Sequence, residues 1–420
     1  MDENITLNLA NRDSKINEED LSLAFRDEDK KTKIGLEKKW ITFLILGIIG
    51  ILGGVGCFLF ILLMPEEKRT GIVFPNIPSA TSEEATYSAL TGEPLNNASL
   101  KEAPVYCIQT PNGTDGARPQ AGLNQAGVVF EAVAEAGITR FAAIYQNPTT
   151  AVIGPIRSLR IYYLEWDTPF DCTIVHAGGS GDALQALASG GYKDLTENYT
   201  YMYRGTYSGR LWNNLFTTAA NLKQFSTDRG YNTSEIKGFP RFLPTEALKN
   251  KVDTLSLEPL KITNATDANT SELSVQVPKI SLRFGNTPTF NINYTYNLES
   301  NTYLRSYGNG LAHEIYACPD ENLGEKNPED VCTLTQVAPS VVIAMVVNER
   351  RASDNYHEDI TTIGSGKAYI FQNGTVIEGT WNKASRADQI KFLDNEGSEI
   401  KLVPGQTFIS AVPNYGGVEY

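Results

Sequence analysis

Hydrophobic and polar positions follow two different patterns in the parts of this 420-residue chain that lie after residue 86. From Tyr87 to about residue 248, short runs of β-branched and aromatic residues alternate with stretches that carry apolar residues at helical spacing. Such a pattern predicts an α/β or α+β domain, because strands and helices follow each other along the chain. The predicted strands are residues 105–110, 127–133, 139–146 and 172–179.

Two stretches of this first domain predict helices. Between Pro155 and Trp166, apolar side chains recur at helical spacing and indicate one buried stripe. A second, short helix is expected from Asp182 to about Ser189. The strand runs 127–133 and 139–146 are separated by only five residues, which is consistent with a hairpin.

The remainder of the chain reads differently. Residues 249–275 are polar and predict an interdomain linker, and residues 276–420 predict a smaller, mostly β domain. Asn373-Gly374 lies between two alternating runs, which is the strongest short-range signal for a hairpin. A further hairpin and a closing strand are expected within residues 392–413.

An uncharged segment precedes both domains. Residues 40–64 are long enough for a helix that spans a bilayer, so a single transmembrane helix is predicted. A lipidation site at Cys57 is the alternative, but Gly54 stands where a large aliphatic residue is usual and more apolar residues follow the cysteine. A cleaved signal peptide would have a shorter apolar run.

Charge near this segment predicts its orientation. Lysines cluster just before residue 40, and basic residues beside a span remain on the cytoplasmic side. We therefore expect a disordered cytoplasmic tail at residues 1–39, a stalk at 65–86, and an extracytoplasmic globular region after it, anchored to the cell membrane. The net charge of -13 argues against a nucleic-acid partner.

Four cysteines lie outside the uncharged segment, and an even number in an exported domain permits disulfides. Cys318 and Cys332 bracket a polar, turn-rich loop and predict a local bridge. Cys107 and Cys172 lie in apolar runs, where either a bond across adjacent strands or two buried thiols would fit. No cysteine or histidine spacing indicates zinc, and we expect neither a metal nor a cofactor.

Several long motifs resemble those of the YerB-like family of bacterial envelope proteins. They are LTGEP (90–94), ARPQAGLNQAGVVFEAVAEAGITRFAAIY (117–145), IGPIRSLRIYY (153–163), VHAGGSGDA (175–183), SGKAYIFQNGTVIEGTW (365–381) and VPGQTF (403–408). The resemblance covers nearly everything from Tyr87 onward. It implies a two-domain, membrane-tethered or lipid-anchored protein whose function is unknown, and it supplies no catalytic residue.

The stretch that begins at Gly154-Pro155 is the first candidate for chemistry. A proline at the first helical position suits a helix start, so the amides of Ile156, Arg157 and Ser158 would face outward at the positive end of the helix dipole. Arg157 and Arg160 would share one helix face, and together these donors predict a site for phosphate or carboxylate. Alternatively, both arginines pair with Glu131 or Glu135.

The loop from His176 to Asp182 follows a predicted strand, where ligands of α/β sheets gather. Gly178 and Gly179 would permit close approach of a ligand to the backbone, and Ser180 or Asp182 could cap the next helix. His176 is either a structural histidine or a ligand or acid–base group. A nucleophile elbow is excluded, because Asp182 stands where that motif needs glycine.

Glu131 and Glu135 form a third candidate, because paired carboxylates hydrolyse glycosides. A salt bridge to Arg140, Arg157 or Arg160 is the simpler interpretation. Arg118, and the segment from Trp212 to Asn214, could line the same cleft.

The sequence thus predicts a membrane-anchored extracytoplasmic protein that binds an anionic component of the envelope. The first alternative is an envelope hydrolase that uses Glu131, Glu135 or His176. The second is an assembly scaffold whose partner is another envelope protein. Whether the protein is an enzyme is left open by the sequence.

Overall fold

The computed structural model describes residues 86–206, 212–247, 277–320 and 322–420. Glu84–Tyr420 form one compact unit. The expected cytoplasmic tail, the expected transmembrane helix (40–64), almost all of the stalk and the expected linker (249–275) lie outside the described residues. Among the residues that are described, no helix is long and apolar enough to cross a membrane.

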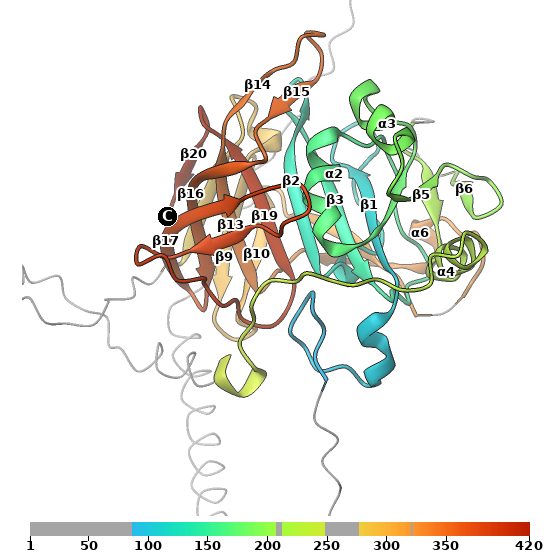
Figure 1. Ribbon diagram of the computed structural model, residues 1–420, viewed down its shortest axis with the longest axis horizontal. Coiled ribbons are helices and arrows are strands. Elements are labelled where there is room, and N and C mark those ends of the chain that lie inside the picture. Colours follow the sequence, from blue (N-terminus) through green and yellow to red (C-terminus); the bar gives the residue numbers. More distant parts are fainter. Residues whose placement is uncertain (1–85, 207–211, 248–276, 321) are drawn as a thin grey trace, which may run out of the picture. The chain divides into compact units, whose positions relative to one another are not determined.

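A ten-stranded mixed sheet forms the centre of this unit (Figure 1). Its strands, in spatial order, are β18 (Lys391–Leu393), β17 (Thr375–Lys383), β16 (Gly364–Gln372), β13 (Val341–Val347), β19 (Thr407–Pro413), β2 (Val128–Glu135), β3 (Ile138–Gln146), β1 (Val105–Pro111), β4 (Thr173–His176) and β5 (Lys193–Thr196). The first part of the chain is therefore mixed and rich in strands, and the last part is mostly β.

The two parts of the chain share this sheet. The strand β19, which lies close to the carboxyl terminus, pairs in parallel with β2 on one side and with β13 on the other. The pairing aligns Ser410 with Glu131. As a result, the β-rich second part continues the sheet of the first.

Two of the three predicted hairpins are confirmed as paired strands. The third, within residues 392–413, is reduced to a single antiparallel bridge between Leu393 and Glu399, and the closing strand predicted there is β19. Strands β2 and β3 pair antiparallel, with a bulge near the turn. Strands β16 and β17 pair antiparallel over nine residue pairs, from Gly364↔Lys383 to Gln372↔Thr375. At their turn, Asn373 and Gly374 have φ values of 53° and 69°, as a tight two-residue hairpin turn requires.

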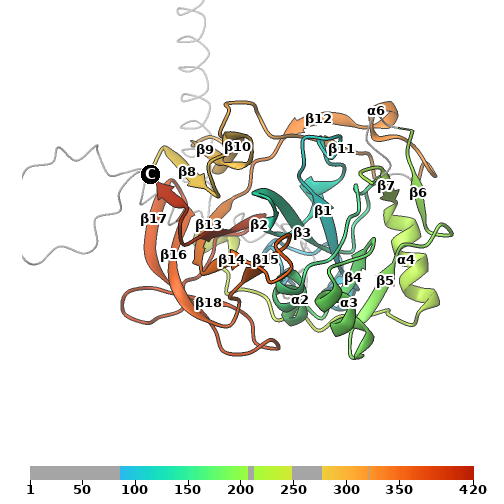
Figure 2. The same cartoon turned by 90° about the horizontal axis from the view of Figure 1, so that it is seen from above.

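Both faces of the central strands are buried. Phe130 on one face of β2 packs in a cluster with Trp166 and Phe170, and Val129 on the other face packs with Phe141 and Phe408. The helices α2 (Ile161–Asp167) and α3 (Gly181–Ala188) belong to the first face. On the second face lie α4 (Ala219–Asp228), the pair β6 (Met202–Arg204) and β7 (Leu215–Thr217), and the pair β11 (Glu314–Ala317) and β12 (Thr333–Gln336) (Figure 2).

A second sheet packs on the β-rich end of the first. It contains, in order, β10 (Thr302–Tyr307), β9 (Ile292–Asn297), β8 (Lys279–Arg283) and β20 (Gly417–Glu419). Its inward residues, such as Leu282 and Tyr303, contact Val342 and Phe371 of the large sheet. Two smaller elements complete the fold: the hairpin of β14 (Glu349–Arg351) and β15 (Glu358–Ile360), and the helix α6 (Pro328–Val331).

The helix predicted from Pro155 to Trp166 is wrong in its first half. Helix α2 begins at Ile161, and residues 155–160 are extended. The amide of Ile156 donates to the carbonyl of Leu215 (2.7 Å) and that of Arg157 to the carbonyl of Gln109 (2.7 Å). Pairing with distant strands therefore replaces helical hydrogen bonds, and tertiary contacts override the local pattern. The second predicted helix is confirmed as α3.

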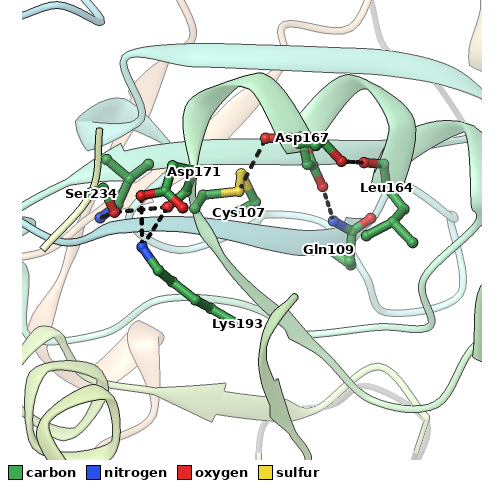
Figure 3. Close-up of a disulfide and its surroundings, with 10 residues drawn as sticks. Cys107, Gln109, Leu164, Asp167, Asp171, Lys193 and Ser234 are labelled. Atoms are coloured by element: carbon green, nitrogen blue, oxygen red, sulfur yellow. Dashed lines mark hydrogen bonds and ion pairs between the residues drawn. A yellow bond between two sulfur atoms is a disulfide. The ribbon is translucent and has the colours of Figure 1, made fainter. Parts of the chain in front are cut away.

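Both disulfides form. Cys318–Cys332 confirms the expected local bridge, and Cys107 is bonded to Cys172, which settles the open alternative. The Cys107–Cys172 bond joins β1 to the residue before β4 (Figure 3). Beside this bond, the carboxyl group of the buried Asp167 accepts from the side-chain amide of Gln109 (3.0 Å). Burial raises the pKa of Asp167 well above its usual value, which favours the neutral acid.

Candidate functional site

The extended segment 155–160 lies beside the loop that follows β4, and this contact gathers many of the sequence candidates. The carbonyl of Arg157 accepts from the amide of Ala177 (3.0 Å). The amide of Leu159 donates to the carbonyl of Gly178 (3.0 Å), and its carbonyl accepts from the amide of Ser180 (3.0 Å). The segment therefore acts as a short extra strand between β1 and the glycine loop.

This geometry also corrects the expected anion site. The amides of Ile156 and Arg157 already bond to carbonyl groups, so they do not form a helix start that faces a ligand. In an extended segment, successive side chains point to opposite sides. Arg157 and Arg160 are three residues apart, so they point to opposite sides and do not share a face as they would on a helix. They line two separate cavities.

Glu135 pairs with Arg140 and Arg160, two of the three arginines that the simpler interpretation named. Its carboxylate contacts Arg140 and Arg160, both at 2.8 Å. Burial raises the pKa of Glu135, but the two guanidinium groups outweigh burial and hold the pKa below its usual value. The second nitrogen of Arg140 donates to the carbonyl of Ser158 (2.6 Å), so Ser158 belongs to the same cluster.

Arg157 differs from these arginines. It is half-buried, and no acceptor in the described part of the chain lies within hydrogen-bond or salt-bridge distance of its guanidinium. Burial lowers its pKa, and the negative charges of Glu135 and Asp115 act in the opposite direction. Arg157 therefore keeps hydrogen-bond donors available for a ligand.

A cavity of about 360 Å³ lies at Arg157, and we call it the Arg157 cavity. It is lined by Ile156, Arg157, Ala177, Glu197, Arg204, Trp212 and Leu215. Glu197 and Arg204 pair with each other at 2.7 Å, so they add no net charge. Trp212 is 45% exposed and offers an aromatic surface beside the arginine, as the sequence suggested for this segment.

His176 lies beneath this region and is only 2% exposed. One ring nitrogen contacts the carboxylate of Asp194 (2.8 Å), and the other contacts the carbonyl of Gly178 (2.7 Å). Both nitrogens are thus engaged, and the ring ties β4 to β5 and to the glycine loop. The structural role fits this geometry better than contact with a ligand.

Glu131 and Arg118 lie elsewhere, in a buried polar network that connects the two parts of the chain. Arg305 of β10 donates to both carboxylate oxygens of Glu131 (2.9 and 2.8 Å), and both side chains are fully buried. Arg118 donates to Asn112 (2.9 Å), and its guanidinium lies 3.7 Å from the ring centroid of Tyr307.

A second cavity, of about 590 Å³, lies between the start of α3 and the hairpin β14–β15, and we call it the hairpin cleft. Its lining includes the expected Arg160, Ser180 and Asp182. The hairpin contributes charged residues that sequence reasoning missed: Arg350, Arg351, Asp354, His357, Glu358 and Asp359. These residues pair mostly among themselves, as in Arg350–Asp359 (2.6 Å) and Arg351–Glu358 (3.4 Å). The cleft therefore mixes both signs of charge.

Glu349, on the same hairpin, titrates near neutrality. Burial raises its pKa to about 7, although a hydrogen bond from Tyr415 opposes the shift. The unfolded chain releases this proton near pH 4.3, so the folded state loses stability as pH rises from there to about 7.

We therefore expect Glu349→Gln to flatten the pH dependence of stability. The amide stays neutral and can still accept from Tyr415, so the variant should gain up to about 3 kcal/mol over the parent at pH 8 and little at pH 4. Urea unfolding at both pH values measures the difference. The exposed glutamate variant Glu396→Gln is the control, and an equal gain at both pH values would contradict the assignment.

The groups named for hydrolysis are engaged in other contacts. Glu131 is paired with Arg305, Glu135 with two arginines, and His176 with Asp194. A general acid or base must reach the substrate's proton, so these pairings count against the hydrolase alternative. Across the described ranges, no cluster of three or more histidine, cysteine or acidic side chains could hold a metal ion.

Comparison with known proteins identifies the family. The chain matches the "Protein of unknown function (DUF3048) N-terminal domain" over residues 90–232 and the corresponding C-terminal domain over residues 280–409. It is 27% identical over 379 residues to "Putative lipoprotein YerB" of Bacillus subtilis, which covers 90% of this chain and 96% of that protein.

A solved structure supports the same fold. The crystal structure of the YerB protein from Bacillus subtilis matches with a TM-score of 0.60 and 22% sequence identity, over 80% of this chain and 100% of that chain. The family resemblance expected from the sequence motifs is confirmed. This chain belongs to the YerB-like family and carries both DUF3048 domains.

Proposed function

We propose that this protein is a membrane-anchored, extracytoplasmic binding protein of the cell envelope, and that it holds a phosphate- or carboxylate-bearing component at Arg157. The placement is supported by the lipoprotein description of the Bacillus subtilis relative and by two disulfides, which suit an oxidising compartment. The charge pattern around residues 40–64 supports the same placement.

The single observation that carries the ligand class is the guanidinium of Arg157, which has no acceptor among the residues that the structure describes. Its neighbours Arg140 and Arg160 are neutralised by Glu135, and Arg204 by Glu197. A half-buried cation without a partner costs free energy, and an anion that binds there recovers it. Trp212 provides an adjacent flat surface, so a ligand with an anionic group next to a sugar ring or apolar face fits the Arg157 cavity.

The assembly-scaffold alternative depends on a different structural feature from the ligand-binding proposal. A scaffold requires a large exposed apolar patch and does not use an unpaired arginine in a cavity. The exposed apolar side chains, such as Leu311, Leu334 and Tyr356, come from separate elements. We therefore favour the ligand-binding protein.

Arg157→Gln should lower ligand-induced stabilisation to roughly 0.4–1.4 kcal/mol at the ligand concentration given below, and should leave the ligand-free fold intact. The parent protein is screened by thermal unfolding against inorganic phosphate, phosphorylated sugars, lipid-linked phosphates and acidic cell-wall fragments. A ligand at 100 times its Kd should add about 2.7 kcal/mol to the parent. Loss of a charged hydrogen bond should weaken affinity by roughly 10- to 100-fold in the variant.

Arg350→Gln is the matched control, because it removes an arginine that lies in the neighbouring cleft and pairs with Asp359. Its ligand response should equal that of the parent. Arg157→Lys keeps the charge but loses the planar fork, and should bind with intermediate affinity. If no anion on the panel stabilises the parent, or if Arg157→Gln responds as the parent does, the proposal fails.

A further inference from the structure

A nearly uncharged groove lies at β11 and β12, which both contribute residues to its lining. It comprises two adjoining cavities of about 580 and 250 Å³. The two cavities share Thr91, Glu93, Gln125, Gln146 and Asn147, so they form one continuous depression, which we call the amide groove. None of its residues lines the Arg157 cavity or the hairpin cleft.

The chemistry of the amide groove differs from that of the other two cavities. Among the described residues that line it, Glu93 is the only charged one. Six side-chain amides line it: Asn124, Gln125, Gln146, Asn147, Gln336 and Gln406. An amide offers both donors and an acceptor, so this lining suits a ligand with many hydroxyl groups and no net charge.

Four of these amides are held in fixed orientations. Gln125 donates to Asp320 and accepts from Thr149, and Gln146 donates to the carbonyl of Leu100 and accepts from Ser88, so both use their donors and acceptors within the protein. The other two are Gln336 and Gln406. The nitrogen of Gln406 donates to the carbonyls of Leu123 (2.9 Å) and Ala126 (2.7 Å), and the nitrogen of Gln336 donates to the carbonyl of Arg305 (2.8 Å). No donor in the described ranges bonds to either side-chain oxygen. These oxygens are therefore preorganised acceptors, which lowers the entropy cost of binding.

The groove also contains apolar surface between its amides. Leu123, Ile315 and Val337 belong to the core cluster on this face of the sheet and are almost fully buried, so they form a small apolar floor beneath the amides. Sugar rings present apolar C–H faces between their hydroxyl groups, so a mixed lining of this kind matches them. The described lining contains no positive side chain, so it does not favour an anionic polymer or an acidic peptide.

We propose that the amide groove binds a neutral, linear oligosaccharide. The two adjoining cavities and their repeated amides favour several linked sugar units over a single small molecule. This site is independent of the anion proposed at Arg157, and either site can exist without the other.

The test uses the full chain and three variants. Neutral tetrasaccharides (β-1,4-linked glucose, α-1,4-linked glucose and β-1,4-linked N-acetylglucosamine) are titrated by calorimetry up to about 20 mM, where weak Kd values remain measurable. Ala338→Trp places a bulky ring in the groove and should lower affinity at least about tenfold. Asn124→Ala removes the amide of an exposed lining residue and should lower the affinity for the tetrasaccharide about two- to tenfold. Arg157→Gln should bind as the parent does.

Three results would overturn the proposal. The first is no binding by any neutral tetrasaccharide. The second is binding that Ala338→Trp and Asn124→Ala both leave unchanged, with circular dichroism equal to that of the parent. The third is displacement of the sugar by an uncharged tetrapeptide at equal concentration, which would assign the groove to peptides.

Discussion

Arg305→Met should destabilise the protein by about 3–5 kcal/mol, which is the largest effect we expect from any single substitution. Arg305 donates through all three guanidinium nitrogens, to Glu131, Tyr294 and His313. Removing it leaves the fully buried carboxylate of Glu131 without its cation. Urea unfolding of the parent and the variant at neutral pH measures the loss.

The double variant Arg305→Met/Glu131→Gln separates the charge effect from lost packing. With both charges gone, most of the loss should be recovered, because a neutral amide is far cheaper to bury than an unpaired carboxylate. If the double variant is as unstable as Arg305→Met, the buried ion pair is not the cause. The pair spans β2 and β10, so its loss should also weaken the union of the two parts of the chain.

The protonation of His313 supports the same network. Burial and the positive charges of Arg305 and Arg118 hold its pKa well below the usual value, so the ring is neutral. One nitrogen accepts from Arg305 (2.8 Å) and the other donates to Gln120 (3.0 Å). A neutral ring with a single hydrogen satisfies both contacts, which is consistent with the direction of the shift.

Loss of the Cys107–Cys172 bond in the Cys107→Ala/Cys172→Ala variant should cost about 4 kcal/mol, the second-largest effect. The bond closes a loop with a sequence separation of 65, and the entropy that it removes from the unfolded chain grows with loop length. Removing Cys318–Cys332, with a separation of 14, should cost about 3 kcal/mol. Chemical denaturation of both double variants measures the two losses.

Comparison of the two bonds makes this prediction specific. The Cys107–Cys172 bond is buried beside Asp167 and β4, so its loss also removes packing contacts. Cys318–Cys332, in contrast, closes a more exposed loop. A loss under about 1 kcal/mol for Cys107→Ala/Cys172→Ala would contradict the account.

Strands and turns that rest on local chemistry could be predicted from the sequence. Asn373-Gly374 predicted the β16–β17 turn because both residues tolerate positive φ. The hairpin β2–β3 and the bridge Cys318–Cys332 also follow from short-range patterns. In each case, the partners lie within about 15 residues, so few competing arrangements exist.

Features that depend on distant pairing could not be predicted in this way. The segment 155–160 has helical spacing, yet its amides bond to Gln109 and Leu215, which no local pattern reveals. The insertion of β19 beside β2 and the partnership of Arg305 with Glu131 connect residues far apart in sequence. The same holds for the hairpin cleft, because β14 and β15 come from the second part of the chain.

For the candidate site, the residue types were found but not their grouping. Arg157, Arg160 and the glycine loop do lie in one region, but Arg160 is neutralised and His176 is buried. The ligand contact that we propose is Arg157, which lines a cavity together with Trp212. Pairing partners decide which arginine remains available, and these partners are set by the tertiary fold.

The central claim is that an anion contacts the guanidinium of Arg157. The most direct test is a ¹⁵N-arginine NMR titration of the full chain with the strongest anion from the panel, in which the Arg157 Nε–H signal is assigned by its loss in Arg157→Lys. We predict that this signal shifts saturably and that the Arg350 signal does not. A titration in which the ligand binds while the Arg157 signal stays fixed would contradict the account.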